Sequence, residues 1–173
     1  MRRSIPALSR AAATLILALS TAVGVPAAAQ AGPAPSLLAS SAYTLTQAEA
    51  FVAQSGIQVE PTTDVGGGFD VGWFTPGDWI AFDLDFGATS PRTVTTRLAN
   101  GGVISGTIRY RLDSPTGTPI ATTLVFPTGG WQTWSTVPAD LHASATGVHR
   151  VYVTVTGGSG IDLVNINWFK FNA

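Results

Sequence analysis

The stretch from Trp79 to Gly87, WIAFDLDFG, places an apolar side chain at every second position. The apolar residues that share one face of an extended chain are Ile80, Phe82, Leu84 and Phe86. Asp83 and Asp85 fall on the opposite face, with Ala81 between the apolar positions. Alternation of this kind is typical of a β-strand with one buried face.

Two later segments repeat the pattern, TIRYRLDS at residues 107–114 and RVYVTVTG at residues 150–157. Turn-forming sequences separate such strands: ANGG at 99–102, DSPTG at 113–117 and TGGSG at 156–160. From Tyr43 onward no segment sustains a helical period, and no repeat of about 20–50 residues suggests a propeller or solenoid. The sequence therefore predicts an all-β domain, with two antiparallel sheets in a sandwich.

The first residues have the layout of a secretory signal peptide. Arg2, Arg3 and Arg10 precede the apolar run Ala11 to Val25, and small residues follow up to Ala29. We expect residues 1–29 to be a signal peptide, residues 30–42 a linker rich in Ala, Pro and Ser, and residues 43–173 the folded domain. The chain is then expected to be secreted and extracellular. The apolar run is shorter than a bilayer span of about 20 residues requires.

Charge and composition exclude several kinds of partner. Residues 30–173 contain six basic and ten acidic side chains, a net charge of −4. Nucleic acids and anionic membranes both select basic surfaces, so neither is an expected partner. The chain has no cysteine, so its stability must come from the core, with calcium as a candidate metal because calcium prefers oxygen ligands.

Signals for catalysis are weak. The chain has two histidines, His142 and His149, and no G-x-S-x-G motif. Glycoside hydrolysis needs two carboxylates at a set separation, and Glu60 with Asp64 or Asp70 is the pair that the sequence offers. We expect no enzymatic activity.

Two tryptophans occupy loop-like positions. Trp73 lies between Gly72 and a Pro-Gly turn, and Trp131 follows Gly129 and Gly130. A sugar-binding site combines aromatic rings, which stack on the apolar face of a pyranose, with amide or carboxylate groups that bind its hydroxyls. From their positions alone, either ring fits a binding role and a core role equally well.

Four segments in order give a resemblance to a known family: TQAEAF (46–51), GGGFDVGWFTPGDWIAFDLDFG (66–87), YRLDSPTGTPIATTLVFPTGGWQTWSTV (110–137) and TGVHRVYVTVTG with LVNINWFKF (146–171). Together they resemble the family-6 carbohydrate-binding modules over nearly all of residues 44–172. The resemblance implies a jelly-roll β-sandwich without catalysis, of a kind usually attached to glycoside hydrolases.

The resemblance also assigns a glycan site in the loops at one end of the sandwich. Its two stacking rings fall on Trp73 and Trp131, and its asparagine falls on Asn165. Members that bind glucan chain ends add a glutamate, which matches Glu60. The family most often has tyrosine where this chain has Trp73, so the fine specificity stays open.

A structural calcium is the second implication of the resemblance. Its ligands from the first strand match Gln47 and Glu49, and a third ligand from the last strand falls near Asn167, where members often carry a carboxylate. Plain strand-surface residues remain the alternative at these positions.

The combined prediction is a secreted, non-catalytic, monomeric module that binds a plant, algal or microbial polysaccharide of xylan or β-glucan type. The alternatives are a fragment or variant of a glycoside hydrolase with weak hydrolytic activity, and a secreted adhesion protein. The bound glycan, and its recognition at chain ends or mid-chain, stay open.

Overall fold

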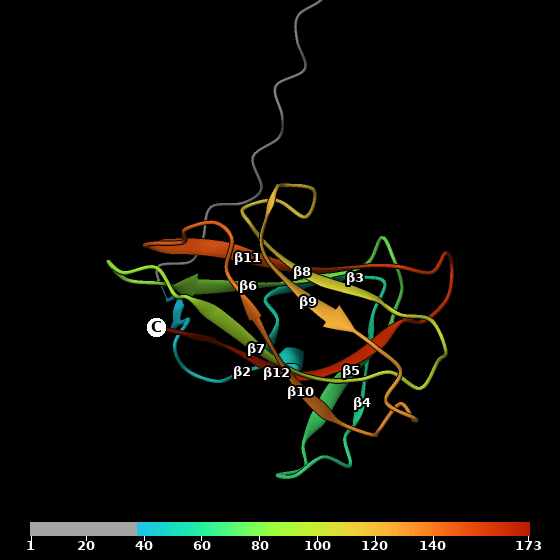
Figure 1. Ribbon diagram of the computed structural model, residues 1–173. Helices are drawn as coiled ribbons and strands as arrows, with labels where there is room; N and C mark the ends of the chain where they lie inside the picture. Colours follow the sequence, from blue (N-terminus) through green and yellow to red (C-terminus); the bar gives the residue numbers. More distant parts are fainter. Residues whose placement is uncertain (1–37) are drawn as a thin grey trace, which may run out of the picture. The chain divides into compact units, whose positions relative to one another are not determined.

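The structure, a computed structural model, describes residues 38–173, which fold into two layered β-sheets (Figure 1). The first sheet is the upper layer in the figure. Its strand order is β1 (Ser40–Ser41), β6 (Trp79–Asp85), β11 (Val148–Thr156), β8 (Gly106–Leu112) and β9 (Pro119–Val125). The short strand β3 (Ala53–Ser55) pairs with β6 beside β1. All of these pairs are antiparallel except β1 with β6.

The second sheet is entirely antiparallel. Its strand order is β10 (Ser135–Asp140), β7 (Thr93–Ala99), β12 (Val164–Asn172), β5 (Phe69–Phe74) and β4 (Gln58–Pro61). The strand β2 (Thr46–Gln47) pairs with β12, and the short 3-10 helix η1 (Ala48–Ala50) follows it directly. The predicted jelly-roll β-sandwich of two antiparallel sheets is confirmed.

The core between the sheets is formed by the alternating residues that the sequence identified. Ile80, Phe82 and Leu84 of β6 are buried there. The Phe82 and Phe169 rings meet edge to face, with centroids 5.0 Å apart. Such aromatic pairs contribute about 0.5–1.5 kcal/mol beyond the burial of their area. The core therefore fixes β6 against β12, the strand that carries Asn165 and Asn167.

The ordered domain begins earlier than the predicted boundary at residue 43. Ser40–Ser41 forms β1, and the Ala42 amide donates a hydrogen bond of 2.9 Å to the Asp85 carbonyl. Ala42 is fully buried. The composition of these three residues predicts a linker, whereas their backbone pairs with β6.

The predicted signal peptide, residues 1–29, and most of the predicted linker lie outside the described residues. Residues 38–173 contain no helix that is long and apolar enough to cross a membrane.

Candidate functional site

A bulge in β5 directs Trp73 outward. Val71 pairs with Ile166 and Phe74 pairs with Val164, so two residues of β5, Gly72 and Trp73, lie opposite Asn165 alone. An extra residue of this kind bends the strand and re-aims a side chain. Trp73 has a φ of 52°, in the left-handed region, and 41% of its surface is exposed. Strained conformations of this kind cluster at functional sites.

The same bulge brings Asn165 close to the backbone of β5. A Cβ atom added to Gly72 would lie 2.9 Å from Oδ1 of Asn165, which is too close for any side chain. Glycine at position 72 is therefore a requirement of the site, because Asn165 occupies the space that a side chain would need.

Trp131 is supported by the turn at residues 99–102. A Cβ atom added to Gly101 would lie 2.7 Å from Cγ and Cδ1 of the Trp131 indole, so the ring rests directly on this glycine. The outer part of the ring is open, and 37% of Trp131 is exposed. An indole held by backbone on one side and open on the other is a rigid apolar platform.

The four predicted ligand residues lie together. Glu60, Trp73, Trp131 and Asn165 line one pocket of about 160 Å³, although they come from four separate segments of the chain. Drug-sized ligands occupy pockets of about 300–1,000 Å³. This pocket is therefore suited to one small ring, with the remainder of a larger ligand outside it.

Asp162 is the fifth lining residue and was missed by the sequence analysis. It lies three residues before Asn165, at the end of the glycine-rich loop 157–160. Asp162 and Trp131 also line an adjoining groove with Val103, Ile104 and Ile161, three exposed aliphatic side chains. The length of the preceding loop was the available signal, but nothing in the sequence indicated that this carboxylate faces the pocket.

Hydrogen bonds fix the polar side of the pocket. Nδ2 of Asn165 donates to Oε1 of Glu60 at 2.8 Å and to the Trp131 carbonyl at 3.1 Å. Both amide hydrogens of Asn165 are thus used inside the protein, so the carbonyl oxygen is what it can offer to a ligand. Glu60 retains its second oxygen, Oε2, as an acceptor for ligand hydroxyl groups.

Gln132 links the Trp131 loop to β4 and β5. Its Nε2 donates to Oε1 of Glu60 at 3.1 Å and to Oδ2 of Asp70 at 2.8 Å, and its Oε1 accepts the Thr63 amide at 2.9 Å. Gln132 is adjacent to Trp131 in the chain, so it holds the indole and Glu60 in a fixed relation. Sequence reasoning did not identify this residue.

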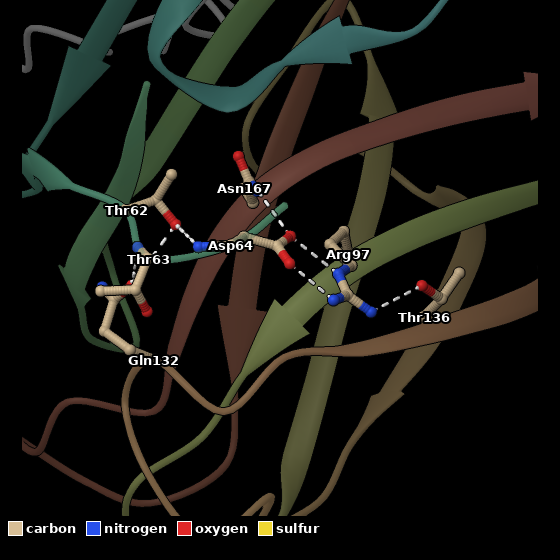
Figure 2. Close-up of polar contacts among 7 residues, drawn as sticks. All are labelled: Thr62, Thr63, Asp64, Arg97, Gln132, Thr136 and Asn167. Atoms are coloured by element: carbon tan, nitrogen blue, oxygen red, sulfur yellow. Dashed lines mark hydrogen bonds and ion pairs between the residues drawn. The ribbon is translucent and has the colours of Figure 1, made fainter. Parts of the chain in front are cut away.

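Asp64 and Asp70, the suggested partners of Glu60 in hydrolysis, do not line the pocket. Asp64 forms a two-point ion pair with Arg97, at 2.6 and 2.8 Å, which holds the pKa of the Asp64 carboxyl at about 2 (Figure 2). Asp70 is fully buried, and this burial raises its pKa to about 6, with the charges of Glu60 and Glu49 adding to the rise. The acidic side chains of the pocket itself are Glu60 and Asp162.

The three predicted calcium ligands come from neighbouring elements. Gln47 of β2 pairs with Trp168, the residue after Asn167, and Glu49 lies on η1, which packs against β12 and β5. Oε2 of Glu49 is buried and has no hydrogen-bond partner within residues 38–173. Nδ2 of Asn167 donates to Oδ2 of Asp64 at 2.8 Å, and its amide oxygen points away from Asp64 (Figure 2).

An unpaired buried carboxylate oxygen is costly unless a cation or a donor satisfies it. Glu49 therefore fits a cation ligand. In the described part of the chain no three acidic or histidine side chains gather as a metal-binding group. A cation here would also need amide and carbonyl oxygens, which calcium accepts readily.

The fold is a β-sandwich in which two partly exposed indoles line one pocket, Trp131 from a loop and Trp73 from strand β5 rather than from the loop that the sequence suggested. The family described as carbohydrate binding module (family 6) matches residues 47–173. The chain belongs to this family, as the resemblance predicted.

Solved structures of family members share the fold. The chain is 39% identical to a β-1,3-glucan-binding family-6 module from Bacillus halodurans, with a TM-score of 0.74 over 78% of this chain and 99% of that one. It is 40% identical to a family-6 module from Clostridium cellulolyticum in complex with xylose, with a TM-score of 0.71 over 77% and 99% of the two chains.

Larger proteins contain similar segments. An arabinoxylan arabinofuranohydrolase of Paenibacillus polymyxa is 37% identical over 133 residues, which cover 75% of this chain and 20% of that protein. The clotting factor G alpha subunit of Tachypleus tridentatus is 34% identical over 140 residues, which cover 78% and 19%. The chain thus spans about a fifth of the length of these relatives.

Proposed function

We propose that this chain is a secreted, non-catalytic module that binds a polysaccharide of xylan or β-glucan type. One observation carries the proposal: Trp73, Trp131, Asn165 and Glu60, distant in sequence, line a single pocket that takes one small ring. The two indoles stack on the faces of a pyranose, and the carboxylate and amide oxygens accept its hydroxyl groups.

The relatives support the substrate class. One similar structure is a β-1,3-glucan-binding module and another holds xylose. A third family member, from Clostridium stercorarium and 30% identical to this chain, holds cellobiose. The acidic pocket adds a restriction, because Glu60 and Asp162 favour uncharged glycans over uronic acids through charge repulsion.

Binding without hydrolysis is supported by the environment of the carboxylates. A retaining or inverting glycosidase needs an acid that can donate a proton to the leaving oxygen. The carboxyl with a raised pKa, Asp70, is buried outside the pocket, and Glu60 already accepts two amide hydrogen bonds through Oε1.

We also propose a monomer that is stabilised by one calcium ion near Gln47, Glu49 and Asn167. The ion would supply positive charge to the buried, unpaired oxygen of Glu49. Its role is to fix β2 and η1 against β12, which leaves glycan recognition to the loop pocket.

Affinity electrophoresis against xylan, laminarin, mixed-linkage glucan, cellulose derivatives and agarose tests the binding proposal. We expect retardation by at least one neutral polysaccharide and none by polygalacturonate. Reducing-sugar release from the same substrates should stay at the buffer level. No retardation in any gel would contradict glycan binding, and product formation would contradict the non-catalytic assignment.

A further inference from the structure

Asp70 is an unusual residue in this site because its carboxylate is fully buried on β5. Oδ2 accepts a hydrogen bond of 2.8 Å from Gln132, whereas Oδ1 has no hydrogen-bond partner within residues 38–173. Buried carboxylates are normally paired or bound to a metal. Glycan binding does not explain Asp70, because this residue does not line the pocket.

Glu49 has a second carboxylate oxygen that lacks a hydrogen-bond partner within the described residues. Its Oε2 is also buried without a partner in the described part of the chain, and η1, which carries it, packs against β5. A Cβ atom added to Gly68, two residues before Asp70, would lie 4.0 Å from Oε1 of Glu49, so the Glu49 carboxylate lies beside the start of β5. Asp70 and Glu49 thus each have one buried oxygen without a partner in the described residues, and a shared cation would satisfy both.

The basic residue of this region does not supply that charge. Arg97 donates through Nε and Nη2 to Asp64, and through Nη1 to Thr136 at 3.1 Å (Figure 2). Asp64 in turn receives the amide of Asn167. The guanidinium charge is therefore neutralised by a third carboxylate, and Asn167 contributes no charge of its own.

Strands β5 and β12 are antiparallel neighbours, and Val71 pairs with Ile166. Asp70 comes directly before Val71 and Asn167 directly after Ile166, so both residues lie on the same side of this pair along the strands. Asn167 therefore brings an uncharged amide to this region of β12, whereas β5 brings a carboxylate oxygen without a partner in the described residues. We propose that Asp70, through Oδ1, holds the structural calcium together with Glu49 and supplies negative charge that the amide of Asn167 does not. This inference rests on the calcium ion of the proposed function and not on glycan binding.

Calcium titration by calorimetry tests the proposal on the full chain after removal of bound metal, at pH 7.5. Asp70→Asn keeps the shape of the side chain and can still accept from Gln132, but it removes the charge. We expect at least a tenfold loss of calcium affinity, and a similar loss for Glu49→Gln. Asp140→Asn is the control for calcium affinity, because it removes the charge of an exposed carboxylate at the end of β10, and we expect less than a threefold change.

Melting temperature separates a metal ligand from a purely structural residue. In EDTA, Asp70→Asn should melt above the parent because a buried repulsion is removed, whereas in excess calcium it should melt below the parent. A variant that melts lower by the same amount in both conditions, or that keeps the parental calcium affinity, overturns the proposal. A parent chain that binds no calcium overturns it as well, whereas failure of glycan binding in affinity gels would leave this result unaffected.

Discussion

Replacement of Trp131 by alanine is the sharpest test of the pocket, because it removes the ring alone. Asn165 is bound to the backbone carbonyl of Trp131, which alanine retains, so the polar side of the pocket keeps this contact. Aromatic stacking on a planar ligand ring contributes about 1–3 kcal/mol in nucleic-acid complexes. A similar contribution here corresponds to an affinity loss of roughly 5- to 150-fold.

The same substitution will also lower stability by a predictable amount. Because 37% of Trp131 is exposed, the remainder is covered by protein. A buried tryptophan covers about 150–250 Å² in total, so roughly 100–150 Å² is lost on truncation. At ~25 cal/mol per Å² this is about 3 kcal/mol, or about 2 kcal/mol after allowance for a compact unfolded state. The melting temperature should then fall by roughly 5–10 °C.

Calorimetric titration with the preferred oligosaccharide at 20 °C, with circular dichroism to verify folding, separates the two effects. The control is Phe126→Ala, which removes another aromatic ring of similar exposure that does not line the pocket. We expect the control to bind within twofold of the parent. Trp131→Ala that binds as tightly as the parent would refute the stacking argument.

Three further predictions concern the surroundings of the pocket. Gly72→Ala should weaken glycan binding about tenfold, or ~1.4 kcal/mol, because the new Cβ would lie 2.9 Å from Oδ1 of Asn165; a titration with unchanged affinity would show that Asn165 moves freely. EDTA should lower the melting temperature without changing which polysaccharide is bound, and an identical melting curve would argue against the calcium ion. The pKa of Asp64, lowered to about 2 from 3.8, provides about 2 kcal/mol of stability that is present above pH 4 and lost as pH falls towards 2. Chemical denaturation at pH 5 and pH 2.5 should therefore show that the free energy of unfolding falls less for Asp64→Asn than for the parent. An equal fall in both proteins would show that the Asp64–Arg97 ion pair does not cause the acid sensitivity.

Much of the fold was predictable because alternation is a local property. The apolar positions of Trp79 to Gly87 predicted the core-facing side of β6, and similar segments predicted β8 and β11. The prediction that only one face of β6 is buried was wrong, because Ala81 and Asp83 on its other face are buried as well. The boundary at residue 43 was not predictable, because Ser40–Ser41 becomes a strand only through pairing with β6. Its sequence carries no strand signal of its own.

Four of the five residues that line the pocket were predictable, but the contacts that hold them in place were not. The resemblance located Trp73, Trp131, Asn165 and Glu60, which the structure places in one pocket. The bulge that turns Trp73 outward depends on the register between β5 and β12.

The supporting contacts could not be predicted because they join positions far apart in the chain. Gln132 contacts Glu60 and Asp70 across more than 60 residues of sequence, and Asp64 meets Asn167 across more than 100. No short motif contains such pairs, so Gln132 and Asp162 were missed.

The links made by Gln132 have a consequence for selectivity. The Gln132 side chain joins the Trp131 loop to β4, to β5 and to the loop that begins at Thr62. These contacts fix the walls of the pocket in the absence of a ligand. A preformed slot sacrifices little conformational freedom on association. If the pocket binds a glycan as proposed, its fixed shape would discriminate among polysaccharides by the direction in which a linkage leaves the bound ring.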